Sequence, residues 1–169
     1  LHELIRRVMF AEFVPEEQRF ALREVDLAFV RRAMATTPPE SGIAAYADPR
    51  AYPAGYVKFL LYGGDAPEIP ARISSFNKVG DAYGFLTDSA YVVDFEAGVE
   101  FLLSATVYAN ANGTFNDDAY DYDTVGFPFL RALGEVVLEH ERARHRQRAP
   151  DLSALAELDG YEGPLASSP

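Results

Sequence analysis

The change of hydrophobic period near residue 71 constrains the fold of this chain more than any other feature. Before Ala71 apolar residues recur with the 3.6-residue period of helices, and after it they alternate with polar residues. Side chains alternate between the two faces of a strand, so the first strand should present a different set of residues on each face. We expect Ile73, Ser75, Asn77 and Val79 on one face, and Ser74, Phe76 and Lys78 on the other.

Two further strands are predicted directly after the first. Residues 83–95 include the run 90–93, which is apolar at every position and indicates a strand covered on both faces. A tight turn at 96–98 leads into residues 99–108, where apolar and polar side chains alternate regularly. Because the connections are short, the three strands should form an antiparallel meander.

Helices are predicted on both sides of this meander in the sequence. Residues 1–10 and 24–34 have helical patterns, and a short helix at 56–62 should end at a left-handed Gly63. A long helix should begin at Pro128, a residue favoured in the first turn. The apolar face of the second helix is expected to hold Val25, Phe29 and Ala33, and that of the long helix Leu130, Leu133, Val136 and Val137.

These elements predict an α+β fold: an antiparallel β-meander with flanking helices and a C-terminal helix packed on the sheet. Residues 1–148 should form one domain. Residues 149–169 have weak periodicity and end in Ala-Ser-Ser-Pro, which predicts a loosely attached tail.

Composition excludes several classes of function. The 169 residues are 49% hydrophobic and carry a net charge of -11, which indicates a folded domain whose surface repels nucleic-acid phosphates and anionic membranes. We therefore expect no nucleic-acid partner, and no apolar run is long enough to predict a membrane segment. There is no cysteine for a disulfide or a thiolate nucleophile. The start at Leu1 reads as the interior of a longer protein.

Residues 76–88 carry a Lys-x-Gly triplet, Lys78-Val79-Gly80, that runs into an aromatic strand and a Thr-Asp step. This segment resembles the third active-site motif of the penicillin-binding protein and serine β-lactamase superfamily. The resemblance extends from about residue 15 to 148. It includes the sequences of residues 50–59, 116–123 and 126–130, which are similar to the C-terminal part of a bacterial branch of these hydrolases.

The resemblance implies a partial β-lactamase/transpeptidase-like fold and an acyl-serine mechanism on an amide or ester. The resemblance implies that Lys78 attracts the substrate carboxylate and assists proton transfer, that Gly80 leaves the strand edge open, and that the backbone N–H of Asp81 is an oxyanion donor. It places Val79, Ala82 and Tyr83 at the substrate, and implies no cofactor and no metal.

The nucleophilic Ser-x-x-Lys of such enzymes precedes this motif by more residues than lie ahead of Lys78 here. The chain is therefore expected to be the C-terminal portion of a serine hydrolase, inactive alone, whose partners are the missing N-terminal half and a small-molecule or peptide-like acyl substrate. The resemblance also implies a periplasmic or secreted location. The sheet lacks the N-terminal strands of that fold, which would expose an edge that a second copy could pair with.

Val79 departs from the family pattern, because many members have Thr or Ser there. Valine favours an esterase-like or amidase-like relative, or an inactive one. The alternative from another class is a non-catalytic binding or scaffold module derived from the same fold.

Other segments only imitate catalytic or metal-binding motifs. Ser75 and Lys78 spell Ser-x-x-Lys, but on a strand they point to opposite faces, which disfavours a self-contained hydrolase. Tyr108-Ala109-Asn110 follows the Lys-x-Gly triplet instead of preceding it, and Tyr46-Ala47-Asp48 ends in the wrong residue. The acidic loop with Asp117, Asp118, Asp121 and Asp123 fails the calcium-loop spacing, and His2, His140 and His145 lack metal-ligand spacing.

Overall fold

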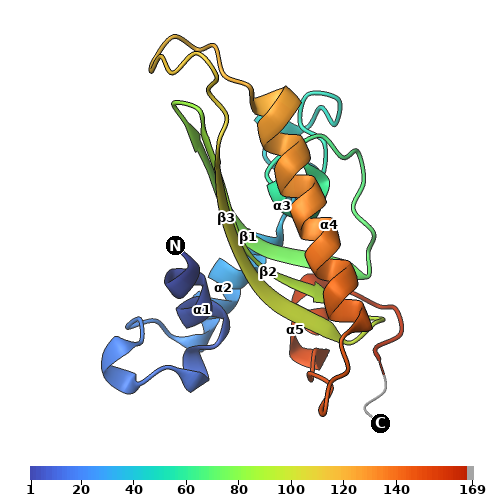
Figure 1. Cartoon of the computed structure of the whole chain (residues 1–169). Coiled ribbons are helices and arrows are strands. Elements are labelled where there is room, and N and C mark those ends of the chain that lie inside the picture. The colour runs from blue at the N-terminus through green and yellow to red at the C-terminus, as the bar shows by residue number, and fades with distance from the viewer. Residues whose placement is uncertain (167–169) are drawn as a thin grey trace.

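The computed structural model describes residues 1–166 and contains the predicted antiparallel meander. The strands β1 (Ile73–Ala82), β2 (Phe85–Asp94) and β3 (Val99–Tyr108) lie in sequence order in one sheet (Figure 1). With five α-helices around the sheet, the α+β class is confirmed. None of the described helices is both long enough and apolar enough to span a membrane.

One face of the sheet is covered by α4 (Phe127–Ala143) and the short α3 (Phe59–Tyr62), which pack against each other (Figure 1). Their approach is close, because a Cβ at Gly134 would lie 2.5 Å from the backbone nitrogen of Leu61. The core on this face buries Phe59, Leu60, Leu61, Ile73, Leu86, Ala90, Val92, Val99, Leu130 and Leu138.

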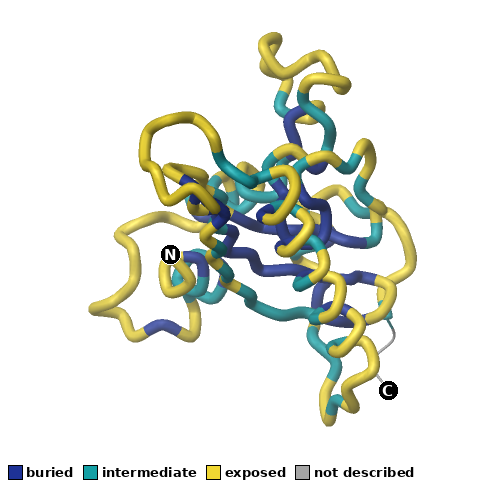
Figure 2. Tube along the Cα trace, turned by 45° about the horizontal axis from the view of Figure 1, so that its top comes forward, coloured by how far each residue is buried: buried dark blue, intermediate teal, exposed yellow. Residues whose placement is uncertain are grey.

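The opposite face of the sheet packs against α1 (His2–Met9), α2 (Glu24–Ala35) and α5 (Ser153–Asp159). Because both faces are covered, the middle of the sheet is the most deeply buried part of the chain, as the dark blue segments of Figure 2 show. This second core contains Ile5, Met9, Phe76, Tyr91, Val93, Phe95, Leu152 and Ala156.

The predicted apolar face of α2 was wrong. Val25 is 63% exposed and Phe29 is 74% exposed, whereas Leu27 is buried. The helix carries apolar residues on more than one side, and the side with Leu27 and Met34 packs toward the sheet. On α4, Val136 is likewise 64% exposed, and the buried stripe runs through Leu130, Gly134 and Leu138.

The short helix predicted at 56–62 is reduced to a single interrupted turn. Leu60 and Leu61 have non-helical backbone angles, although Gly63 ends the turn in the predicted left-handed conformation. The N–H of Leu60 donates a hydrogen bond of 2.9 Å to a carboxylate oxygen of Asp88 on β2. In a regular helix over 56–62 this N–H would bond the Tyr56 carbonyl instead.

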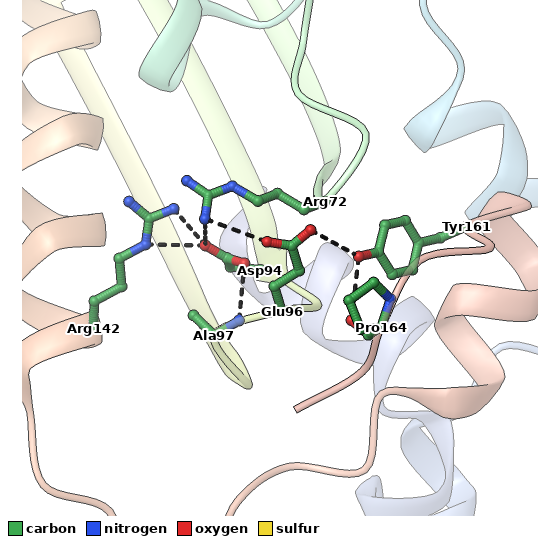
Figure 3. A network of polar contacts seen from close by, with 7 residues as sticks. All are labelled: Arg72, Asp94, Glu96, Ala97, Arg142, Tyr161 and Pro164. Atoms are coloured by element: carbon green, nitrogen blue, oxygen red, sulfur yellow. Dashed lines mark hydrogen bonds and ion pairs between the residues drawn. The ribbon is translucent and has the colours of Figure 1, made fainter. Parts of the chain in front are cut away.

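A network of charged side chains ties the β2–β3 turn to α4 and to the C-terminal segment (Figure 3). Asp94 is fully buried and accepts hydrogen bonds from the Arg142 guanidinium and from the N–H of Ala97. Arg72 lies 3.7 Å from Glu96, which accepts a hydrogen bond from the Tyr161 hydroxyl.

The segment after residue 148 is not a loosely attached tail over its described part. Leu152 and Ala156 are each 5% exposed, and the ring of Tyr161 stacks on Phe95 with centroids 4.7 Å apart. The N–H of Ala166 bonds the Phe95 carbonyl, which anchors the chain to the sheet. The rest of the predicted tail, 167–169, lies outside the described residues.

Candidate active site at the free edge of β1

The edge of β1 that faces away from β2 changes from covered to open along the strand. The Lys58 ammonium bonds the carbonyl of Ser75 at 2.7 Å, so this carbonyl points away from β2. Because N–H and C=O groups point alternately to the two sides of a strand, Val79 and Asp81 share the outward direction of Ser75. From Lys78 to Ala82 the strand is exposed or half-buried, so the outward groups of its last part face an uncovered edge.

Lys78 lies at this open part of the edge. Its register partner is Ser89, on the sheet face that also carries Phe76 and Tyr91. The side chain is exposed, and its ammonium contacts the carbonyl of Val79. The ammonium therefore lies at the surface, although α1 covers the neighbouring part of that face, where His2 bonds Ser104 at 2.8 Å.

Gly80 and Asp81 extend the open edge. A Cβ at Gly80 would have no heavy atom within 4 Å, so the absence of a side chain is not required by packing there. The N–H of Asp81 points away from β2, in the same direction as the groups of Ser75, because the direction alternates along a strand. Among the described residues no strand pairs with β1 on that side. These two residues follow Lys78 and Val79 on the same strand.

Val79 and Asp81 also line a cavity of about 990 Å³ on the α4 side of the sheet. Their side chains point to the face opposite that of Lys78, as the alternation of β1 requires. Arg131 crosses this region and bonds the Tyr62 carbonyl at 2.7 Å and the Asp65 carboxylate. The other walls come from residues between 49 and 67 and from α4, and they include Arg50, Pro53, Tyr56, Phe59, Phe127 and Glu135.

Ala82 and Tyr83 lie where β1 turns into β2. Tyr83 and Gly84 both have positive φ, of 52° and 88°, which gives a two-residue hairpin turn. Tyr83 is 52% exposed, and its ring meets Phe115 edge-on with centroids 6.5 Å apart. Both residues are thus available at the end of the open edge.

A buried polar cluster made by Lys58, Asn77 and Asp88 supports β1 just before the open edge. Asn77 joins the two charged residues: its carbonyl oxygen accepts from Lys58 at 2.8 Å, and its amide donates to Asp88 at 2.9 Å. Burial lowers the pKa of Lys58 to about 8, against the opposing charge of Asp88. Burial also raises the pKa of Asp88 to about 6, although hydrogen bonds from Leu60 and Asn77 oppose this shift.

Sequence reasoning missed this cluster, although one signal was present. Lys58 is one of only two lysines in the sequence and stands in an otherwise apolar run, 57–62. A lysine in such a run must find partners if the run is buried.

The residues that only imitate catalytic or metal-binding motifs have structural roles. Ser75 is buried on the face opposite Lys78, so the two do not form a dyad. Asn110 bonds the Thr114 carbonyl in the loop after β3. In the same loop Asp121 accepts the N–H of Ala111 at 2.8 Å, and Asp117 accepts the N–H of Ala119 at 3.1 Å. These carboxylates stabilise loop turns.

Within four residues of one strand edge, the arrangement offers a cation at Lys78, an open glycine at Gly80 and an outward N–H at Asp81. Such a row can hold an anionic or acyl group beside the strand, but it contains no nucleophile. Within the described residues Ser-x-x-Lys occurs only at 75–78, on a strand. No protein-family model, curated protein or solved structure matches this chain.

Proposed function

We propose that the chain is the C-terminal portion of an acyl-serine hydrolase of the β-lactamase and penicillin-binding-protein type. In this proposal Lys78 attracts the substrate carboxylate, Gly80 leaves room at the edge, and the Asp81 N–H is one oxyanion donor. Val79, Ala82 and Tyr83 contact the substrate. The serine and its lysine come from a segment outside these 169 residues.

The observation that carries the proposal is the uncovered edge of β1 at Lys78–Ala82. Lys58 covers the β1 edge at Ser75, so only the part from Lys78 to Ala82 is open. An extended acyl substrate would therefore meet Lys78, Gly80 and Asp81 first. The order of helices, meander and closing helix α4 also agrees with the C-terminal half of that fold.

The test compares the 169-residue chain with a protein extended toward the N-terminus until it includes a Ser-x-x-Lys helix. We expect the extended protein to react with a fluorophosphonate probe at that serine and to hydrolyse a p-nitrophenyl ester or a chromogenic β-lactam. The 169-residue chain should do neither. Labelling of Ser75, or turnover by the 169-residue chain, would show that the nucleophile lies within it and contradict the proposal.

A second candidate is a non-catalytic binding or scaffold module of the same origin. Val79, which offers no hydroxyl at the edge, favours it. If the edge serves as an interface, the chain should form a dimer in light scattering that Asp81→Pro abolishes, because proline cannot donate a backbone hydrogen bond. A monomer over the whole concentration range would count against this interface.

A further inference from the structure

The ammonium of Lys58 bonds three separate parts of the chain. It donates to the carbonyl of Met34 at 2.6 Å, to the carbonyl of Ser75 at 2.7 Å and to the side-chain oxygen of Asn77 at 2.8 Å. An ammonium has three protons, so each of them has an acceptor. Met34 lies in the last turn of α2, where carbonyls lack helical partners and a cation is favoured.

Hydrogen bonds on either side of Lys58 fasten its segment to the sheet. The Asn77 amide donates to the carbonyl of Val57 at 2.8 Å, and Asp88 accepts the N–H of Leu60 at 2.9 Å. Lys58, Asn77 and Asp88 are 1%, 7% and 0% exposed. The position of Lys58 is thus set by bonds to both β1 and β2.

This cluster contacts the residues that flank Lys78. Asn77 precedes Lys78 in the chain, and Asp88 is the register partner of Val79. The covered part of the β1 edge therefore ends where the residues proposed to meet substrate begin.

We propose that Lys58 is a positioning residue: acting through Asn77 and Asp88, it fixes the part of β1 that presents Lys78, Gly80 and Asp81 at the open edge. The ammonium itself is buried and does not touch substrate. The catalytic meaning of this role rests on the proposed function, whereas its effect on the strand does not.

The variant that tests this role is Lys58→Met, which removes the charge and keeps the length of the side chain. In amide NMR spectra we expect the Gly80 and Asp81 signals to move, although neither residue bonds Lys58, while Val99 at the far end of β3 stays in place. The control is Arg144→Met, which removes an exposed cation at the end of α4 and should leave the Gly80 and Asp81 signals in place. If Lys58→Met leaves the Gly80 and Asp81 signals unchanged, or shifts signals evenly across the sheet, the role is overturned.

A second measurement applies to the wild-type chain and does not depend on the folding of a variant. Lysine-selective ¹³C labelling should give two side-chain signals, because the chain has two lysines. On raising the pH, the amides of Val79 and Asp81 should move with the same midpoint as the Lys58 signal. The charged groups that face Lys58 are Asp88 on β2, Asp159 on α5 and Glu40 in the loop after α2.

Amide midpoints that differ from that of Lys58 would overturn the role. Both measurements use the 169-residue chain without substrate. A failure of the extended protein to hydrolyse esters would therefore count against the proposed function alone, and a failure of the coupled shifts against the positioning role alone.

Discussion

Asp94 at the end of β2 and Arg142 near the end of α4 form a buried ion pair, in which the guanidinium Nε lies 2.9 Å from a carboxylate oxygen. Asp94 is fully buried, and the Arg142 side chain is 30% exposed. The pair joins the helix that closes one face of the sheet to the strand at its centre.

Substitution of Arg142 by Met should lower the free energy of unfolding by about 3 kcal/mol, because it leaves a buried carboxylate without its main partner. Urea unfolding measures this loss. Arg144→Met is the matched control: Arg144 is 51% exposed and pairs with Glu141 three residues earlier, so its loss should be below about 1 kcal/mol. Equal losses for the two variants would show that the Asp94 pair is not a main support of the fold.

Asp88 should make stability fall as the pH rises from about 4 to about 6. Its folded pKa is raised from 3.8 to about 6, so in this range the folded state binds more protons than the unfolded state. The ionised, buried carboxylate then costs free energy, on the order of 3 kcal/mol at full ionisation.

The measurement is urea unfolding of the wild type and of Asp88→Asn across this pH range. The variant lacks the titrating group, so its unfolding free energy should change more positively with pH than that of the wild type. Parallel pH profiles would mean that Asp88 titrates in the folded chain as it does in the unfolded chain.

Gly80 in β1 and Gly84 in the β1–β2 turn should respond differently to alanine. Gly84 has a φ of 88°, and a Cβ there would lie 2.4 Å from the Cβ of Asn110. Gly84→Ala should therefore destabilise the chain by at least ~1 kcal/mol through backbone strain and crowding. Gly80→Ala meets open space and should change stability by less than about 1 kcal/mol. Thermal unfolding distinguishes them, and a similar loss in both variants would contradict the open edge at Gly80.

The two lysines should differ in chemical reactivity. Reductive methylation at mildly alkaline pH should modify Lys78, whose side chain is exposed, and leave Lys58, which is 1% exposed and bonded to three oxygens. Peptide mapping by mass spectrometry locates the methyl groups. Fast modification of Lys58 in the folded chain would mean that the polar cluster opens readily.

The meander could be predicted from the sequence because strand alternation is a local property. The faces expected for Ile73 and Phe76 are correct, and the turn at 96–98 follows from its residues. The buried side of α2 could not be predicted in this way, because Val25 and Leu27 are both apolar and only the position of the sheet decides between them.

The candidate site was likewise predictable from the sequence only in part. Lys78, Gly80 and Asp81 lie within four residues of one strand, so their common edge follows from that strand alone. The cluster of Lys58, Asn77 and Asp88 joins three segments, and only the folded chain shows which polar groups meet. The packing of residues 152–161 also depends on a distant partner, the second core of the sheet.

The most direct test of the proposed function is the effect of Lys78→Ala on ester hydrolysis by the extended protein that includes a Ser-x-x-Lys helix. Loss of the ammonium should lower kcat/KM by about 10²-fold or more, a typical effect of removing one electrostatic contact at the reacting group. The urea midpoint should stay the same, since Lys78 is exposed. A Lys78→Ala variant that turns over substrate at the wild-type rate would contradict the role of this edge in catalysis.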